Sequence, residues 1–402
     1  MIPPGWTEAA LGDVAALVRG VTFKPSDVQQ MGDPGTVACM RTKNVQSELD
    51  LDDVLAVPAS VVKRPDQYLL SGDTLVSSAN SWNLVGKCSW VGELPWTSTF
   101  GGFVTALRAQ RDKVDPRYLY RWFASPHTQA ILRSFGRKTT SISNLSLDQT
   151  RRMTIPLPPI EEQRRIAAVL DQADELRAKR RAALALLDTL TESIFLDMFG
   201  DPAAHPLGTI TIPLADFVER GDTLNYGVVQ PGPDVRDGVP LVRAADLVGG
   251  TVRTSMLKRI APEIDHQYRS SRIRGNEVLV SCVGSVGAIA IADSDLAGAN
   301  IARAVARVPI ADPDERTYVA AFMRLPIAQR FFQQELRTVA QPTLNLKQLR
   351  ELKVLCPPAE RVGEFAKRAR EVAAITSDSL DHKSQADHLF ASLQQRAFRG
   401  EL

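Results

Sequence analysis

The chain of 402 residues contains two related copies of one sequence, about 200 residues apart. Five matches occur in the same order in both copies. They are 11–14 with 214–217, 72–78 with 275–281, Tyr118, Pro126 and Gln129 with Tyr318, Pro326 and Gln329, 145–149 with 344–348, and Pro158-Pro159 with Pro357-Pro358. The offset falls only from 203 to 199 residues, so short loop deletions account for the mismatch. A duplication of this size predicts two similar domains.

Both copies have the same internal plan. Short segments such as Thr74-Leu75-Val76 and Val278-Leu279-Val280 alternate with Gly, Pro and Asn turns, which predicts short strands. A helical stretch follows, at 116–135 and 315–336, and then a short strand at 153–157 and 352–356. Each copy ends in a long segment that has helical periodicity and no internal proline.

The two long segments carry matching apolar seams, with spacings of three and four as in a heptad repeat. The predicted seam positions are Ile166, Val169, Ala173, Leu176, Leu187, Leu190 and Ile194 in the first helix and Phe365, Val372, Ile375, Leu389 and Leu393 in the second. Arg180 and Ser379 interrupt the two seams at aligned positions. We expect helices of about 39 residues, roughly 58 Å long, that pair as an antiparallel coiled coil. The alternative is that each helix packs separately on its own domain.

The sequence therefore predicts an α+β protein with a pseudo-two-fold internal repeat. Mixed α/β domains at 1–158 and 200–357 are separated by long spacer helices at 159–199 and 358–402.

The sequence contains no convincing catalytic motif. It has no GxxxxGK[ST] loop for nucleotide phosphates, no Asn/Asp-Pro-Pro-aromatic motif and no glycine-rich turn of the kind that binds S-adenosylmethionine. The five histidines show no metal-ligand spacing. Glu351-Leu352-Lys353 resembles the end of a nuclease motif but lacks the preceding Pro-Asp. We expect a non-catalytic protein that binds no metal and no cofactor.

The composition is that of a globular protein. No run reaches the roughly 18 to 20 apolar residues of a membrane span, and the first residues have neither a basic head nor an apolar run. The four cysteines are far apart, which favours structural thiols in a reducing compartment. We therefore expect a cytoplasmic protein without a membrane partner.

Polar side chains cluster in loops at related positions of the two copies. Arginine and lysine can donate two hydrogen bonds to guanine, asparagine and glutamine can pair with adenine, and serine and threonine can contact bases or phosphates. The DNA-binding candidates are Arg41, Lys43, Asn44, Ser78, Asn80, Ser81, Asn83, Arg137, Lys138, Thr139 and Thr140 in copy one and Arg243, Ser281, Ser285, Arg337 and Gln341 in copy two. For any single residue, an ordinary solvated turn is an equal alternative. Because the net charge is only +2, DNA affinity must come from such clusters or from partner subunits.

Several segments resemble the specificity subunits of type I restriction-modification systems. PPIEEQRRIA at 158–167 is similar to the segment that opens their central helix, and LQQRAFRGEL at 393–402 is similar to the end of many members. IPPGW at 2–6 and the GD-x-LVS motif from Gly72 resemble their start and a strand motif of their target-recognition domains. The second copy lacks the EEQ pattern at 359–363.

The resemblance implies a division of labour. Each mixed domain is expected to read half of an interrupted target in double-stranded DNA. The helices are expected to set the unread gap and to dock two methylase subunits, with restriction and translocase subunits as further partners. S-adenosylmethionine and ATP with Mg²⁺ are expected on those partners. A coiled-coil scaffold that reads no DNA is the alternative from another class of protein, and a nuclease is a third.

Overall fold

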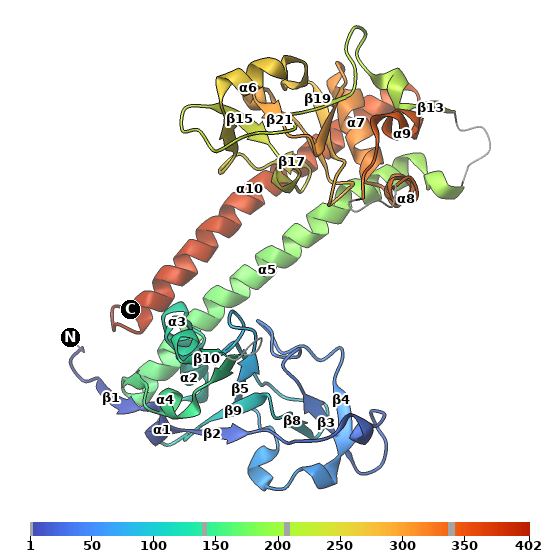
Figure 1. Ribbon diagram of the computed structural model, residues 1–402. Coiled ribbons are helices and arrows are strands. Elements are labelled where there is room, and N and C mark those ends of the chain that lie inside the picture. Colours follow the sequence, from blue (N-terminus) through green and yellow to red (C-terminus); the bar gives the residue numbers. More distant parts are fainter. Residues whose placement is uncertain (1–2, 139–142, 205–209, 337–341) are drawn as a thin grey trace. The chain divides into compact units, whose positions relative to one another are not determined.

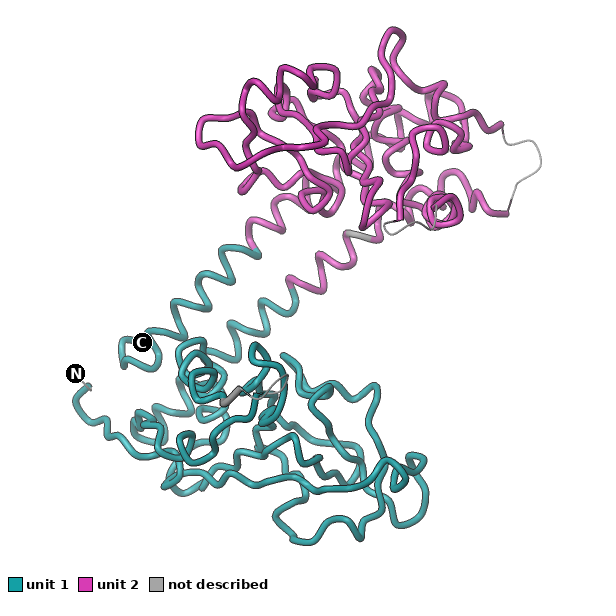
Figure 2. Tube along the Cα trace, in the orientation of Figure 1, with its two compact units in different colours: residues 1–179, 383–402 teal, residues 180–382 magenta. Residues whose placement is uncertain are grey.

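The computed structural model describes residues 3–138, 143–204, 210–336 and 342–402, with only the backbone of Arg137, Lys138 and Asp188. The chain divides into two compact units (Figure 2). Unit 1 comprises 1–179 and 383–402, and unit 2 comprises 180–382. Each unit therefore contains one mixed domain and parts of both long helices, so its borders differ from the four regions predicted above. None of the helices that the structure describes combines the length and apolar character of a membrane span.

Unit 1 is built from short strands around the helices that follow them (Figure 1). Its elements are β1 (Thr7–Ala10), α1 (Leu11–Val14), β2 (Ala15–Arg19), β3 (Thr36–Met40), β4 (Leu55–Pro58), β5 (Thr74–Ser77), β6 (Ala79–Asn80), β7 (Cys88–Trp90), β8 (Ser98–Phe100), β9 (Val104–Ala109), α2 (Pro116–Phe123), α3 (Pro126–Ser134), β10 (Gly136–Lys138), β11 (Ser143–Leu145), α4 (Leu147–Arg151) and β12 (Thr154–Leu157). The sheets have the orders β2-β9-β5-β7, β4-β3-β8, β10-β11-β6 and β1-β12. The pair β3–β8 is parallel, and the other pairs are antiparallel.

Unit 2 repeats this plan. Its elements are β13 (Thr211–Pro213), β14 (Asn225–Tyr226), β15 (Val239–Val242), β16 (Leu247–Val248), β17 (Thr251–Val252), β18 (Lys258–Ile260), α6 (Pro262–Gln267), β19 (Glu277–Ser281), β20 (Ile289–Ile291), β21 (Asn300–Ile301), β22 (Val305–Pro309), α7 (Pro313–Arg324), α8 (Pro326–Gln334), α9 (Leu346–Glu351) and β23 (Lys353–Leu355). The sheets β14-β22-β19-β20, β18-β15-β21 and β13-β23 correspond to three sheets of unit 1, and the parallel pair is again the equivalent one, β15–β21. The sequence duplication is therefore a duplication of topology.

Side-chain hydrogen bonds repeat between the units as well. The amide of Gln129 donates to the carbonyls of Gly86 and Phe123, and the amide of Gln329 donates to those of Gly287 and Met323. Likewise, the hydroxyls of Tyr118 and Tyr318 donate to backbone carbonyls of β12 and β23. These matched residues were recognised in the sequence as a repeat, and their equivalence is confirmed.

The strand pairing corrects the alignment of the GD-x-LVS motif by one residue. The residue equivalent to Ser281 is Ser77, not Ser78. The Ser77 amide donates to the Lys87 carbonyl, and the Ser77 carbonyl accepts from the Gly86 amide. Ser281 makes the same two backbone hydrogen bonds with Ala288 and Gly287. Asp73 therefore corresponds to Glu277. Between these serines and the equivalent glycines, 86 and 287, lie eight residues in unit 1 (78–85) but five in unit 2 (282–286).

The predicted helices at 116–135 and 315–336 are each two helices. Pro126 and Pro326 begin α3 and α8, because proline has no N–H to continue the preceding helix but fits a first helical turn. Ser125 caps α3 by accepting a hydrogen bond from the Thr128 amide. The resulting corner places Tyr118 and Phe123 in the core of unit 1 and Tyr318 and Phe322 in that of unit 2.

The long helices are α5 (Ile160–Phe199), of 40 residues, and α10 (Ala359–Ala397), of 39. Within unit 1 the start of α5 runs antiparallel to the end of α10, since Arg177 pairs with Asp387 and Arg165 donates to the Leu402 carbonyl. Within unit 2 the same two helices meet near Phe195 and Phe365, whose ring centroids are 5.5 Å apart.

The predicted seam is not buried along its whole length. Leu176 and Leu389, both in unit 1, are each 60% exposed, and Leu190 and Ile375 of unit 2 are also exposed, so the expectation of a packed seam is wrong at these four positions. The buried residues of both helices are concentrated near the helix ends, which pack into the domains, and these four positions lie between those buried stretches. Ile166 lies in the core of unit 1 and Phe365 in that of unit 2, while Val372 is also buried. The other seam positions, Val169, Ala173, Leu187, Ile194 and Leu393, are partly exposed.

A buried carboxylate fixes the turn before β5 and β19. In unit 1 both oxygens of Asp73 pair with Arg108, at 2.6 and 2.7 Å, and one also accepts from the Leu70 amide. In unit 2 Glu277 accepts from the amides of Arg274, Gly275 and Asn276 and pairs with Arg307, which is fully buried and also contacts Asp222. The motif therefore serves the fold.

We predict that Glu277→Ala destabilises unit 2 by about 3–5 kcal/mol, because it leaves a buried guanidinium with one partner fewer and three amides without an acceptor. Hydrogen exchange should show lost protection in β19 and β22 and retained protection in β5 and β9. Glu263→Ala, at an exposed glutamate of the same unit, is the control and should shift stability by less than about 0.5 kcal/mol. Unchanged exchange in β19 would contradict this assignment.

Candidate nucleic-acid interface

Near the carboxyl end of β5, the residues that follow this strand lie beside the two strands that border the predicted polar loop at 137–141. Strand β6 follows β5 and pairs with β11, with Asn80 opposite Ser143, and β11 pairs with β10, with Asn144 opposite Arg137. The amide of Leu145 donates to the Ser78 carbonyl at 2.8 Å. The residues that follow the GD-x-LVS strand and the two strands that border 139–142 are thus held in one small sheet.

The first polar cluster, residues 41–44, joins this group through its neighbour Gln46. The Gln46 side chain contacts Lys87, and its carbonyl accepts from the Ser89 hydroxyl at 2.6 Å. Lys87 and Ser89 follow the loop at 78–85. Residues 41–46, 78–85, 136–138 and 143–145, which are separate in the sequence, therefore adjoin one another, and we call them the unit 1 loop surface.

Asn44 is a structural residue and not a DNA contact. Its side chain is fully buried, accepts a hydrogen bond from the Arg41 amide at 2.8 Å and donates to the carbonyls of Asp50 and Asp53. All of its polar atoms are used to hold the turn. The prediction that Asn44 reads DNA is wrong for this reason.

The remaining candidates of the unit 1 loop surface are accessible to different degrees. Arg41 and Lys43 both pair with Asp53, an exposed carboxylate. The Asn80 amide donates to the Ser77 hydroxyl, and the exposed Ser81 donates to Asn83 at 2.7 Å. Ser78 is partly exposed, and its amide donates to the Phe103 carbonyl. These side chains stay candidates.

Unit 2 brings its loops together in the same way. Val283 forms a bridge with Thr343, and the Leu344 amide donates to the Cys282 carbonyl at 2.9 Å. Ser285 is exposed on this loop. Ser281, by contrast, is fully buried. Its hydroxyl donates to the Ser285 carbonyl and accepts from the Ala288 amide, so its hydrogen bonds are made inside the protein. The prediction that Ser281 contacts DNA is therefore wrong.

Arg243 occupies the place of Arg41 in unit 2. Its amide donates to Asp246, three residues later, just as the Arg41 amide donates to Asn44. Its guanidinium makes two further hydrogen bonds to the buried Asp246 carboxylate, each of 3.0 Å, and this contact raises the pKa of Arg243. Arg243 is exposed and stays a candidate. Thr139, Thr140, Arg337 and Gln341 lie outside the described residues, and Arg137 and Lys138 are described by their backbone alone.

The described parts of the chain offer little for catalysis. They contain no group of three His, Cys, Asp or Glu residues that could hold a metal ion. Burial raises the pKa of Cys39, Cys88 and Cys282 to about 12, so these thiols are protonated and behave as core residues.

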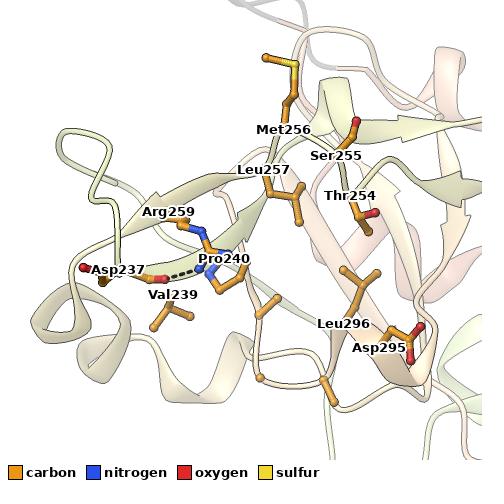
Figure 3. Close-up of a pocket in the computed structure, with 14 residues that line it drawn as sticks. Asp237, Val239, Pro240, Thr254, Ser255, Met256, Leu257, Arg259, Asp295 and Leu296 are labelled. Carbon is orange, nitrogen blue, oxygen red and sulfur yellow. Dashed lines mark hydrogen bonds between the residues drawn. The ribbon is translucent and has the colours of Figure 1, made fainter.

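A pocket of about 610 Å³ lies in unit 2 between β15, β18 and the turn around Leu296 (Figure 3). Its lining includes Val239, Pro240 and Leu257, and the guanidinium of Arg259 is already bound to the Gly238 carbonyl at 2.9 Å. The lining also contains the carboxylates of Asp237 and Asp295 and the hydroxyls of Thr254 and Ser255, but Figure 3 marks no hydrogen bond that joins these four side chains.

Polar patterning alone missed one part of the loop surface. The turn between β8 and β9 ends at Phe103, whose carbonyl accepts hydrogen bonds from the amides of Ser78 and Ala79. Its exposed side chain is aromatic, so a search for clustered polar residues does not find it.

Comparison with known proteins gives consistent results. The family model of the type I restriction modification DNA specificity domain matches residues 3–185. The chain is 30% identical to the EcoBI specificity subunit of Escherichia coli, over all of this chain and 87% of that protein. It is 24% identical to the StySPI specificity subunit of Salmonella potsdam, over all of this chain and 90% of that one.

Solved structures share the fold. The S subunit of a type I restriction-modification system from M. genitalium superimposes with a TM-score of 0.61 at 15% identity, over 99% of this chain and 96% of that one. A chain from a structural study of complex assembly and conformational transition of a type I system superimposes with a TM-score of 0.54 at 19% identity, over the whole of both chains. Because the whole of this chain aligns with the EcoBI subunit at 30% identity, the chain belongs to the specificity subunits of type I restriction-modification systems, which recognise DNA and are not catalytic.

Proposed function

We propose that this chain reads a two-part DNA target, with one half of the target read by the loops of each unit. The observation that carries the proposal is the duplication. The two units share sheet orders and hydrogen-bonded anchors, yet the loop after Ser77 has three residues more than the loop after Ser281. Equivalent scaffolds with different loops suit the recognition of two different base sequences.

The long helices provide the surface for protein partners. Large apolar side chains are exposed on both, at Leu176, Leu186, Leu190, Ile375, Leu380 and Leu389. Contiguous apolar patches that are exposed on a folded protein are typical of sites that bind other proteins. The proposed occupants are two methylase subunits of the same system, which restriction and translocase subunits join. The scaffold alternative, which reads no DNA, is disfavoured by the family.

The chemistry belongs to these partners in our proposal. Methyl transfer from S-adenosylmethionine and ATP-driven steps with Mg²⁺ are assigned to the partner chains, and the present chain holds no cofactor. The assembled complex acts on chromosomal DNA, so we place it in the cytoplasm.

We predict that exchanging residues 1–158 for those of a relative with another specificity changes one half of the methylated motif and leaves the other half intact. Exchanging 200–357 should change the other half. Methylated-base sequencing of strains that carry each chimera with its methylase partners measures both motifs. A chimera of the first domain that retains both parental half-motifs would refute the assignment of that domain.

We also predict the effect of lengthening both helices. A seven-residue insertion between Lys179 and Arg180, matched by one between His382 and Lys383, adds about 10 Å to each helix. If the helices set the spacing, the unread gap grows by about three base pairs while both half-motifs are retained. An insertion of the same length within residues 205–209 is the control and should leave the gap unchanged. An unchanged gap after the paired helix insertions would remove the spacer role.

A further inference from the structure

The turn between β8 and β9 presents an aromatic ring to solvent beside the unit 1 loop surface. Phe103 ends this turn, and its side chain is 64% exposed. Its backbone, however, is fixed. The Phe103 carbonyl accepts from the amides of Ser78 at 2.9 Å and Ala79 at 3.2 Å, and the turn is closed by the Val104 amide, which donates to Gly101.

The backbone at Gly20 and Val21 also approaches the turn closely and fixes its first residues. A Cβ atom on Gly20 would collide with the carbonyls of Phe100 and Gly101, so only glycine fits there. The next amide, of Val21, donates to the Phe100 carbonyl at 2.7 Å. The position of Phe103 is thus determined by the residues that follow β2, by those that follow β5 and by the turn itself.

The fold does not use the side chain that it positions so firmly. Phe100 and Val104, on either side of the turn, belong to a buried cluster of unit 1, whereas Phe103 does not. A single exposed apolar residue is common on protein surfaces. Here, however, Trp82 and Leu84 of the adjoining loop are exposed as well, at 49% and 38%. Large apolar groups therefore gather among the polar candidates of the unit 1 loop surface.

Unit 2 has the same turn with different side chains. The Cys282 amide donates to the Ala304 carbonyl, as Ser78 donates to Phe103, and the Val305 amide closes the turn on Ala302. Gly227 makes the same close approach, here to the Ile301 carbonyl.

Phe103 therefore corresponds to Ala304, and Gly102 corresponds to the exposed Arg303. One turn offers an aromatic ring and the other a cation, on backbones held by equivalent hydrogen bonds. A residue needed for folding would keep its chemistry in both copies. A residue that distinguishes two DNA sequences would change it.

We infer that the β8–β9 turn is a further DNA-reading element of unit 1, in which the Phe103 ring contacts the 5-methyl group of a thymine in the major groove. Thymine is the base whose major-groove edge carries a methyl group, and apolar side chains are its recognised partners. The inference rests on the proposed reading of one half-motif by unit 1. It adds a specificity-determining residue that carries no polar group.

The test uses the complete chain assembled with its methylase partners, bound to duplexes that contain the methylated motif. Each thymine in the half-motif of unit 1 is replaced in turn by uracil, which lacks only the methyl group. For the parent complex we expect one replacement to weaken binding about fourfold, the factor that corresponds to one buried methyl-sized group. Phe103→Ala should bind the thymine and uracil duplexes equally, and Phe103→Leu should retain part of the difference.

Leu70→Ala is the matched control. Leu70 is also an exposed apolar residue of unit 1, but it precedes β5, whereas Phe103 lies at the other end of that strand. This variant should discriminate thymine from uracil as the parent does. Thermal unfolding of each variant checks that the fold is retained, which is expected because both side chains are exposed.

The outcomes separate the inference from the proposed function. If the parent complex binds its motif but no uracil replacement in that half weakens binding, or if Phe103→Ala discriminates as the parent does, the inference is wrong and the proposed function stands. Equal weakening on thymine and uracil duplexes with discrimination retained also overturns it. If the parent complex shows no preference for any sequence, the proposed function itself fails.

Discussion

A carboxylate buried beside an arginine, at the turn before β5 and again before β19, determines where the loops of each unit can lie. The Asp73 and Glu277 carboxylates are withdrawn from solvent, so each must be satisfied by nearby donors, and the arginine together with backbone amides supplies them. This contact fixes the start of the strand. Because the strands have only four and five residues, the start also fixes the end, where the candidate loops begin. Changes in length between the two copies can then be accommodated in the loops.

The two copies can diverge without losing their fold because each keeps an anchor at both ends of the loop. Asp73 and Glu277 differ in length, and their arginines lie at different positions of β9 and β22, yet each pair closes the same turn. Gln129 and Gln329 hold the far end of the loop, at Gly86 and Gly287. Between these two anchors the loop can gain or lose three residues and change its exposed side chains, while Val85 in unit 1 and Cys282 in unit 2 stay in the core.

The sequence predicted the large features of this molecule well, because they depend on period and order. The duplication and the two long helices are examples. The sequence-based predictions were wrong where the outcome depends on a one-residue shift in strand register or on a single side-chain contact. The motif alignment followed the glycines of the two turns, whereas strand pairing shifts them by one residue relative to each other. Asn44 and Ser281 look like DNA contacts in a list of polar residues, but their hydrogen bonds lie inside the protein. Leu176 and Leu389 follow the heptad spacing, yet spacing alone cannot show that the helix ends pack into the domains instead.

The charges at the loop surfaces bear on how the proposed reading can be specific. Arg41 is already paired with Asp53, and Arg243 is paired with Asp246. Asp246 is buried, so drawing Arg243 away from it costs more than breaking an exposed pair. For Arg41, a contact with DNA replaces the pair with the exposed Asp53, and an exposed pair is worth at most about 1 kcal/mol. A bidentate contact with guanine, worth about 1–3 kcal/mol of discrimination, outweighs that loss, whereas a single phosphate contact gains little over the carboxylate that it displaces. With a net charge of only +2, the chain by itself is suited to discriminate between sequences more than to bind DNA in general. In the proposed assembly, the general affinity comes from phosphate contacts made by the partner subunits.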